Sequence, residues 1–226
     1  MARASVKEPA DFGPQQFPDR LGLRLWEFQR ALDDGLIPLS DVAGGRWSAA
    51  VVAAAAERLG EIRAAVGTLP DVGAWRAAEL LAERFGVEVS AETVMELGRK
   101  DIIPVSGEYK GNALYDGRAL ERFADRRALA AAAASGRLHT KDSAAGYLRV
   151  RPADVEHLVR AGWLTEVHRV HSSYQPRKAA PAVALFRQGD LDVLLAHPAI
   201  DWDDVRATPK GRPSALAKLT ASRAGR

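Results

Sequence analysis

The feature that most constrains this sequence is an element that occurs three times. Each copy reads as an amphipathic helix, a tight turn with two bulky apolar residues, a polar loop, an aromatic residue and a second helix. A repeat of this length indicates one supersecondary unit used several times. The paired segments are EFQRALDDGLIP (27–38) with GGRWSAAVVAAAAERL (44–59), TVMELGRKDIIP (93–104) with GNALYDGRALERFADR (111–126), and DVEHLVRAGWLT (154–165) with AVALFRQGDLDVLLAH (182–197).

The end of the first helix is marked in each copy. Apolar residues recur at helical spacing, as Val94 and Leu97 do in the second copy. Gly35 and Gly162 stand where a helix ends in a left-handed cap, and two bulky apolar residues follow each glycine. Asp101 stands at this place in the second copy, and aspartate is one of the residues that tolerate a left-handed conformation. The pattern therefore predicts a helix that stops in a tight turn.

The segment after each turn predicts a β-hairpin. Pro38 and Pro104 keep the chain extended as it leaves the helix. Glycine-containing loops of different lengths follow, as expected for hairpin turns. An aromatic residue then stands at the return of each hairpin, namely Trp47, Tyr115 and Phe186. We expect these rings to pack in the core of a small fold rather than to stack on bases.

A further helix is expected before the element in two copies. Residues 75–85 have apolar side chains on one helical face, and Ser90 is placed to cap the next helix. In the third copy Thr140 is placed to cap a leading helix, and Pro152 stands at the first turn of the second. Prolines within 9–18 predict that the leading helix of the first copy is absent or displaced.

Together these segments resemble a known DNA-binding fold. In the second copy AAELL, FGV, TV, DIIP, YD and RALERF follow in an order similar to the winged helix-turn-helix of the MerR and excisionase-like families. The resemblance covers most of 21–197; it is strongest over 75–126, clear over 139–195 and weakest over 21–59. It implies tandem helices, a two-stranded wing and a packing helix. We therefore expect a mainly α fold with small two-stranded wings, made of tandem winged helix-turn-helix units.

The repeat and the composition of the chain ends set the expected domain boundaries. The tail lacks the apolar surface needed to fold alone. The expected parts are a flexible N-terminal arm (1–20), an incomplete winged helix-turn-helix unit (21–66), a complete unit (71–134), a unit with a long wing (137–205) and a disordered basic tail (206–226).

Charge is distributed unevenly along the chain. The net charge of the 226 residues is +3, but residues 1–205 carry −3 and residues 206–226 carry +6. The basic isoelectric point is therefore weak support for nucleic-acid binding by the folded part. The 25 arginines against 7 lysines also fit the composition of a GC-rich genome. Residues 137–187 differ, because they hold nine basic and four acidic side chains.

The resemblance implies that the second helix of a unit enters the major groove and that the wing follows the backbone or the minor groove. The third unit is the best candidate reader because its surface is the most basic. A solvated charged face is the alternative explanation of its arginines. The expected DNA contacts are Lys141, Arg149, Arg151, His157, Arg160, Arg169, Arg177 and Lys178 in the third unit, Arg99, Lys100 and Lys110 in the second, and Lys210 and Arg212 in the tail.

The tail segment Pro209-Lys210-Gly211-Arg212-Pro213 resembles the core of an AT-hook, with lysine where that motif usually has arginine. The resemblance implies that Arg212 lies in a narrow, A·T-rich minor groove. A generic tail that attracts phosphates is the alternative. Either version predicts binding that weakens steeply with salt.

Motifs of the common enzyme classes are missing from the sequence. We find no P-loop, dinucleotide fingerprint or nucleophile elbow, and no cysteine. His168 and His171 are three residues apart on an expected strand, which places them on opposite faces rather than on one metal ion. We expect no enzymatic activity, no cofactor and no metal. Without a signal peptide or ~20 consecutive apolar residues, the sequence predicts a cytoplasmic, nucleoid-associated protein without membrane contact.

The leading functional hypothesis is a protein that binds double-stranded DNA, as a transcriptional regulator or as a factor organising a plasmid, phage or chromosomal locus. An excisionase-like factor that bends DNA for a recombinase is one alternative. A protein-interaction module is another: degenerate units over 21–134 would dock on a replication or transcription protein. The negative charge of residues 1–205 favours the second alternative. A homodimer is compatible with each hypothesis.

Overall fold

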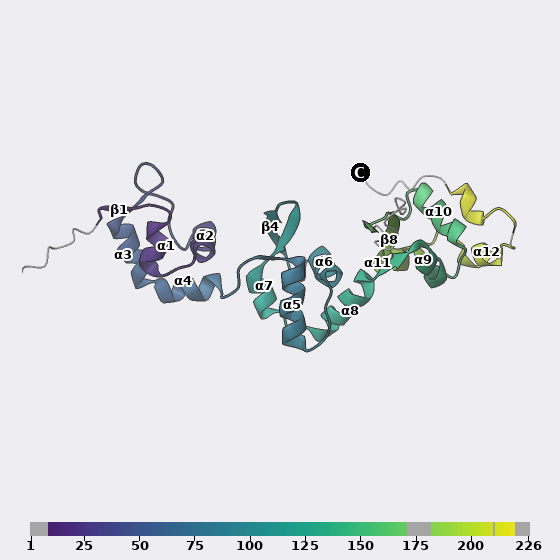
Figure 1. The fold of residues 1–226 in the computed structure, drawn as a ribbon, viewed down its shortest axis with the longest axis horizontal. Helices are drawn as coiled ribbons and strands as arrows, with labels where there is room; N and C mark the ends of the chain where they lie inside the picture. Colours follow the sequence, from purple (N-terminus) through teal and green to yellow (C-terminus); the bar gives the residue numbers. More distant parts are fainter. Residues whose placement is uncertain (1–8, 171–181, 210, 220–226) are drawn as a thin grey trace, which may run out of the picture. The chain divides into compact units, whose positions relative to one another are not determined.

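The computed structural model describes residues 9–170, 182–209 and 211–219. The described chain is mainly helical and carries small antiparallel sheets (Figure 1). It divides into two compact units. Unit 1 comprises Met1–Gly73 and Ile103–Ala124, and unit 2 comprises Ala74–Ile102 and Asp125–Arg226.

The same order of elements recurs three times along the chain: a short strand, two helices, a hairpin and two helices. We call these stretches repeats 1, 2 and 3. Repeat 1 contains β1 (Asp11–Phe12), α1 (Gln16–Leu21), α2 (Leu25–Asp33), β2 (Trp47–Ser48), α3 (Ala49–Glu57) and α4 (Leu59–Val66). Its hairpin is reduced, because an isolated bridge between Val42 and Arg46 stands where the other repeats have an outer strand.

Repeats 2 and 3 have a complete hairpin. Repeat 2 contains β3 (Val72–Gly73), α5 (Ala74–Phe85), α6 (Ala91–Arg99), β4 (Val105–Tyr109), β5 (Asn112–Tyr115), α7 (Gly117–Arg122) and α8 (Arg126–Gly136). Repeat 3 contains β6 (Leu138–Thr140), α9 (Lys141–Leu148), α10 (Pro152–Arg160), β7 (His168–Val170), β8 (Val183–Arg187), α11 (Gln188–Leu195) and α12 (Trp202–Ala207), and the 3-10 helix η1 (Ala215–Lys218) follows.

A leading strand pairs with the return strand of the hairpin in every repeat. The sheet orders are β1-β2, β3-β5-β4 and β6-β8-β7, all antiparallel. The three aromatic residues at the hairpin return occupy the same register, opposite Phe12, Val72 and His139 respectively. All three are buried, as the sequence predicts: Trp47, Tyr115 and Phe186.

The predicted helix ends are confirmed. Gly35, Asp101 and Gly162 adopt φ of 69°, 52° and 72°, the left-handed values expected after each helix. Ser90 Oγ accepts a hydrogen bond from the backbone N–H of Thr93 at 3.3 Å and so caps α6. Thr140 and Pro152 also take their predicted positions, at the cap of α9 and in the first turn of α10.

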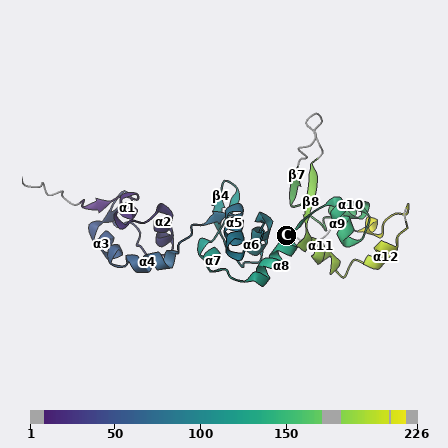
Figure 2. The ribbon, with the colours of Figure 1, turned by 60° about the horizontal axis from the view of Figure 1, so that its bottom comes forward.

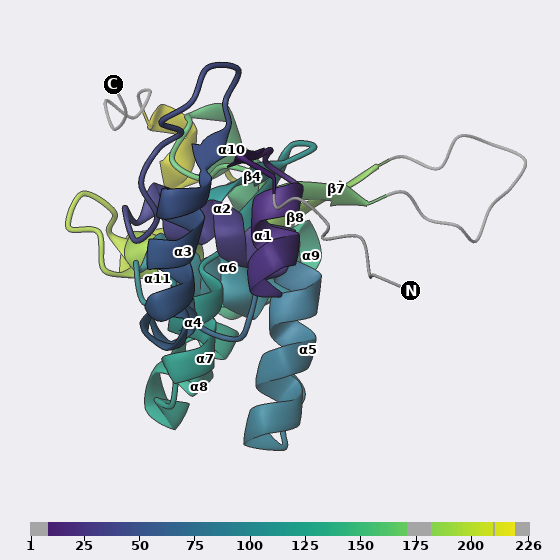
Figure 3. The same ribbon diagram turned by 90° about the vertical axis from the view of Figure 1, so that its left-hand side faces the viewer.

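The expectation of a flexible arm over 1–20, with the leading helix of repeat 1 absent or displaced, is wrong for residues 9–20. β1 and α1 lie in this segment, and Phe17 is fully buried. Pro18 is accommodated because it lies in the first turn of α1, where the missing N–H costs no helical hydrogen bond. Phe17 packs against Phe28 and Trp47, with ring centroids 5.1 and 5.5 Å away. Figure 3 shows α3 beside α1 in this repeat.

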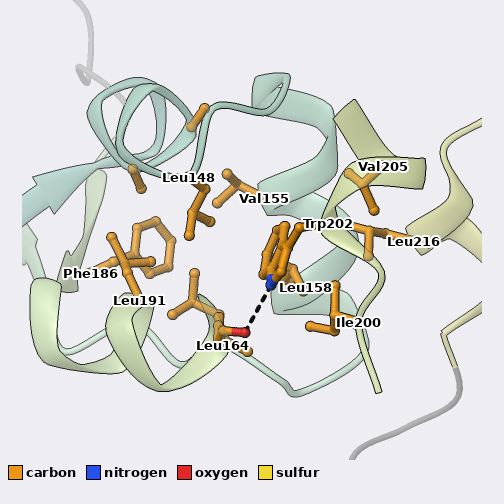
Figure 4. Close-up of a cluster of buried hydrophobic side chains, with 13 residues drawn as sticks. Leu148, Val155, Leu158, Leu164, Phe186, Leu191, Ile200, Trp202, Val205 and Leu216 are labelled. Atoms are coloured by element: carbon orange, nitrogen blue, oxygen red, sulfur yellow. Dashed lines mark hydrogen bonds between the residues drawn. The ribbon is translucent and has the colours of Figure 1, made fainter. Parts of the chain in front are cut away.

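The expectation of a disordered tail from residue 206 is also wrong for the residues described. α12 runs to Ala207, and η1 places Leu216 in the core of repeat 3, where it is 3% exposed. That core is drawn in Figure 4, where Leu216 and Val205 lie next to Trp202. Trp202 Nε1 donates to the carbonyl of Leu194 at 3.1 Å. The tail's overall composition conceals this because one well-placed leucine is enough to anchor a short turn.

Candidate nucleic-acid interface

The outward face of α10 borders an open groove in repeat 3. The groove lies between α10 and the β7–β8 hairpin, which Figure 2 shows extending from the rest of the repeat. Its volume is about 430 Å³. Its floor is apolar and its rim is charged. The floor consists of Val155, Val159, Ala182, Val183, Ala184 and Phe186, and the rim of Lys141, Glu156, Arg160, Glu166 and Arg169.

Two of the predicted DNA contacts on this rim form ion pairs. Lys141 Nζ lies 2.6 Å from Glu156 Oε1, and the hydrogen bond from Lys141 lowers the pKa of Glu156. Arg169 Nε lies 2.8 Å from Glu166 Oε1. Both pairs are largely exposed to solvent, so a phosphate can replace the carboxylate at little energetic cost.

Arg160 is exposed on α10, and His157, one turn earlier, is half-buried. Arg160 Nη1 is 3.3 Å from His157 Nδ1, and no ion pair of Arg160 with a carboxylate within 4 Å is found among the described residues. Arg160 therefore provides hydrogen-bond donors and a positive charge beside the groove, and His157 lies next to it. The arrangement suits contacts to an anionic or acceptor-rich ligand.

Arg149 and Arg151 lie in the turn between α9 and α10 but differ in their roles. Arg149 is exposed and adopts a left-handed conformation with φ of 57°. Arg151 instead holds Asp154, which is 1% exposed, through hydrogen bonds of 3.1 and 3.0 Å. Burial alone would raise the pKa of Asp154, but hydrogen bonds from Arg151 and Ser214 lower it below its ordinary value. Arg151 is thus engaged in the fold.

The equivalent helix of repeat 2, α6, packs against α8 within its compact unit, while Met95 on another face is 42% exposed. α8 packs along it, and Gly136 approaches so closely that an added Cβ would lie 2.9 Å from the carbonyl oxygen of Glu92. The two predicted contacts on α6, Arg99 and Lys100, both pair with buried Glu96, at 2.9 and 3.3 Å. The remaining face of α6 lines a narrow pocket of about 120 Å³ with residues of repeat 3.

The equivalent helix of repeat 1, α2, is covered on the side that bears Trp26 and Arg30. Arg30 is 8% exposed. It donates hydrogen bonds to the carbonyl oxygen of Val66, the last residue of α4, and to that of Leu69, three residues later. It also pairs with Asp71. Trp26 lies beside this arginine, with the Arg30 guanidinium 4.9 Å from its ring centroid. This side of α2 is therefore occupied by the chain's own segments, whereas Gln29 and Asp33 on the neighbouring face are exposed.

The other predicted contacts fall in two groups. Lys110 lies at the exposed tip of the β4–β5 hairpin, with Nζ 5.1 Å from the centre of the Tyr109 ring. Arg212 is exposed, and its carbonyl accepts a hydrogen bond from Arg151 Nη1 at 3.2 Å. Three predicted contacts lie outside the described residues, namely Arg177, Lys178 and Lys210.

Sequence reasoning overlooked one arginine of this region. Arg206 on α12 donates to the carbonyl oxygen of Leu148, at the end of α9, at 3.2 Å. Arg63 on α4 makes the matching bond in repeat 1, to the carbonyl oxygen of Leu21 at 3.4 Å, and a second one to that of Gly22 at 2.9 Å. Aligning the fourth helix of each repeat, as well as the first three elements, would have revealed the correspondence.

No protein-family model, curated protein or solved structure matches this chain. The part of the chain that the structure describes holds no group of three or more histidine, aspartate or glutamate side chains that could bind a metal ion. Among the same residues, no helix has both the length and the apolar character required to cross a membrane. The candidate interface therefore depends on the geometry of repeat 3 itself.

Proposed function

We propose that this chain is a non-enzymatic DNA-binding protein built from three winged helix-turn-helix repeats, and that repeat 3 reads duplex DNA. One observation carries the proposal. The groove beside α10 carries Lys141, Arg160 and Arg169 on its rim. The corresponding exposed face of α2 instead bears Gln29 and Asp33, and Arg99 of α6 pairs with the buried Glu96. One repeat is thus the reader, and the other two have structural or docking roles.

In this proposal α10 enters the major groove with its outward side chains toward the base edges. Arg160 supplies donors suited to guanine, and His157 lies one turn before it along the same face. Lys141 and Arg169 flank the groove and contact phosphates, exchanging Glu156 and Glu166 for the DNA backbone. These phosphate contacts orient the protein on the duplex but do not select a base sequence.

The test is selection of bound duplexes from a random-sequence pool with the full-length protein, followed by affinity measurements on the selected site. Arg160→Ala should weaken binding by about 1–3 kcal/mol and relax the preference at one position. Arg76→Ala is the matched control, because Arg76 is an exposed, ion-paired helical arginine on α5. A wild-type protein without salt-sensitive affinity for any duplex would refute the proposal.

A second candidate function is a protein-docking module. The observation that favours it is the apolar floor of the groove, where Val159 and Val183 remain 37% and 38% exposed. A partner helix or strand would bury these side chains, whereas DNA would not need them. Val159→Asp would then abolish partner binding, while the DNA-binding proposal expects it to act only through added negative charge beside Arg160.

Within the DNA-binding proposal, two roles remain distinguishable by experiment. A transcriptional or locus-organising factor requires only site-specific binding. A single chain would supply one reader for this binding, and a homodimer would supply two. An excisionase-like factor must also bend its site. Comparing the mobility of complexes with the selected site at the centre or at the end of a fragment measures that bend directly.

A further inference from the structure

Repeats 1 and 3 close in the same way on the turn between their first two helices. In repeat 1, Arg24 binds Glu27 through two hydrogen bonds and donates a third to the carbonyl oxygen of Thr68 at 3.3 Å. In repeat 3, Arg151 binds Asp154 in the same manner and donates to the carbonyl oxygen of Arg212. Residues 211–219 are therefore equivalent to the chain after α4, and we call them the closing segment of repeat 3.

The fourth helix completes the match. Arg63 of α4 donates to the carbonyl oxygen of Gly22, the residue that follows α1. Arg206 of α12 donates to the carbonyl oxygen of Leu148, the last residue of α9. Both turns are thus clamped by one arginine before the second helix and one arginine from the fourth helix.

The two clamps differ at two exposed positions beside them. In repeat 1 these are Gly22 and Thr68. In repeat 3 they are Arg149, which follows the Leu148 carbonyl bound by Arg206, and Arg212. Both arginines are exposed, and neither side chain forms an ion pair with the residues that the structure describes. The same local framework therefore carries two additional positive charges in repeat 3.

Arg149 stands where the fold favours glycine. Its φ of 57° lies close to the φ of 61° at Gly22 and of 65° at Gly86, the residues that end the first helix of the other repeats. A side chain with a Cβ is strained in this region, whereas glycine is not. An arginine kept at such a position points to a use for its charge.

Arg212 is held by its flanking residues. Its carbonyl accepts the bond from Arg151, and Ser214 is buried two residues later, where it hydrogen-bonds Asp154. Ser214 Oγ also accepts the backbone N–H of Leu216 at 3.1 Å, and Leu216 is anchored in the core. The Arg212 side chain therefore projects from a fixed point at the start of α10.

We propose that the α9–α10 turn and the closing segment form a phosphate-binding surface, in which Arg149 and Arg212 bind backbone phosphates of duplex DNA beside the start of α10. Arg151 and Arg206 are positioning residues, because their guanidinium groups hold the turn and the segment. Of the two nearby carboxylates, Asp154 is buried against Arg151, and Asp203 lies 3.5 Å from Arg206. This inference rests on the proposed DNA-binding function and adds contacts that do not read sequence.

The test exchanges the exposed residues for those of repeat 1 in the full chain, as the double variant Arg149→Gly and Arg212→Thr. The control double variant, Arg76→Ala with Arg127→Ala, removes the same charge from exposed positions on α5 and α8. Affinity for a labelled duplex of mixed sequence is measured over a salt series. Thermal unfolding of each variant is followed in parallel.

For two lost phosphate contacts, the slope of log affinity against log salt should become shallower by about 1.8, because each contact contributes about 0.9. The control should retain the wild-type slope, and the unfolding midpoint of the exchanged variant should not fall. A wild-type protein that binds, with an unchanged slope in the exchanged variant, overturns this inference but leaves the proposed function standing. A wild-type protein that does not bind overturns both.

Sequence preference separates the phosphate surface from the AT-hook resemblance. If Arg212 binds only phosphate, the sequences selected by wild type and by Arg212→Thr should be the same. A selective loss of A·T-rich flanks in the variant would show that Arg212 reads the minor groove, and it would overturn the assignment to phosphate.

Discussion

Arg187 Nη1, at the end of β8, lies 2.8 Å from Glu96 Oε2 on α6, and the two side chains are 17% and 6% exposed. This contact ties the second helix of repeat 2 to the hairpin of repeat 3 inside one compact unit. Arg99 and Lys100 pair with the same carboxylate. The cluster thus engages both residues of α6 that the sequence predicts as DNA contacts.

Glu96→Gln should lower the free energy of unfolding at neutral pH by about 2 kcal/mol, because it leaves a half-buried cationic cluster with one carboxylate fewer. Arg187 keeps Asp190 as a partner, which limits the loss. Urea unfolding measures the effect. Glu79→Gln is the control, since Glu79 pairs with Arg76 at an exposed site; equal effects of the two changes would contradict the role given to Glu96.

The contribution of Glu96 should depend on pH. Burial opposes its ionisation, but the hydrogen bond from Arg99 and the charge of Arg187 bring its pKa below the ordinary value of 4.5. A carboxylate whose pKa is lower in the folded state than in the unfolded state stabilises the fold at any pH above its unfolded pKa. This stabilisation is lost as the pH falls through the folded pKa. The stability difference between wild type and Glu96→Gln should therefore shrink below pH 4.5 and stay level above it. A difference that grows on acidification would exclude this cause.

Leu216→Ala should destabilise the compact unit that contains repeat 3 by about 2–3 kcal/mol, because it leaves a cavity beside Trp202 and Val205. Lys218→Ala, an exposed change in the same 3-10 helix, should have little effect. Thermal or urea unfolding of the two variants checks the claim. If they behave alike, the closing segment does not pack as described.

Two glycines of repeat 1 should respond with opposite signs to the same change. Gly22→Ala should cost about 1 kcal/mol, because φ at this residue is 61°. Gly60→Ala should stabilise by up to about 1 kcal/mol, because Gly60 lies within α4 and has no atom within 4 Å of an added Cβ. Denaturant midpoints of the pair provide the measurement. Stability changes of the same sign would show that backbone conformation does not determine the effect of alanine at these two positions.

Much of each repeat is local and is therefore readable in the sequence. The helix ends at Gly35, Asp101 and Gly162 follow from which residues tolerate a left-handed backbone. The buried aromatic residues at the hairpin return follow from their recurrence in three copies. The leading strands were not predictable in this way, because a strand of two or three residues acquires its structure only by pairing with a partner that lies 35 or more residues later.

The sequence by itself determined the threefold element order and the basic character of repeat 3. Only the tertiary structure decided what each second helix packs against, because the contacts of α2 with α4, of α6 with α8 and of α10 with η1 join segments far apart in the chain. It also separated arginines that hold the fold, such as Arg151, from exposed ones such as Arg149. Identical side chains differ in role because a buried carboxylate neutralises one guanidinium and leaves the other to face solvent.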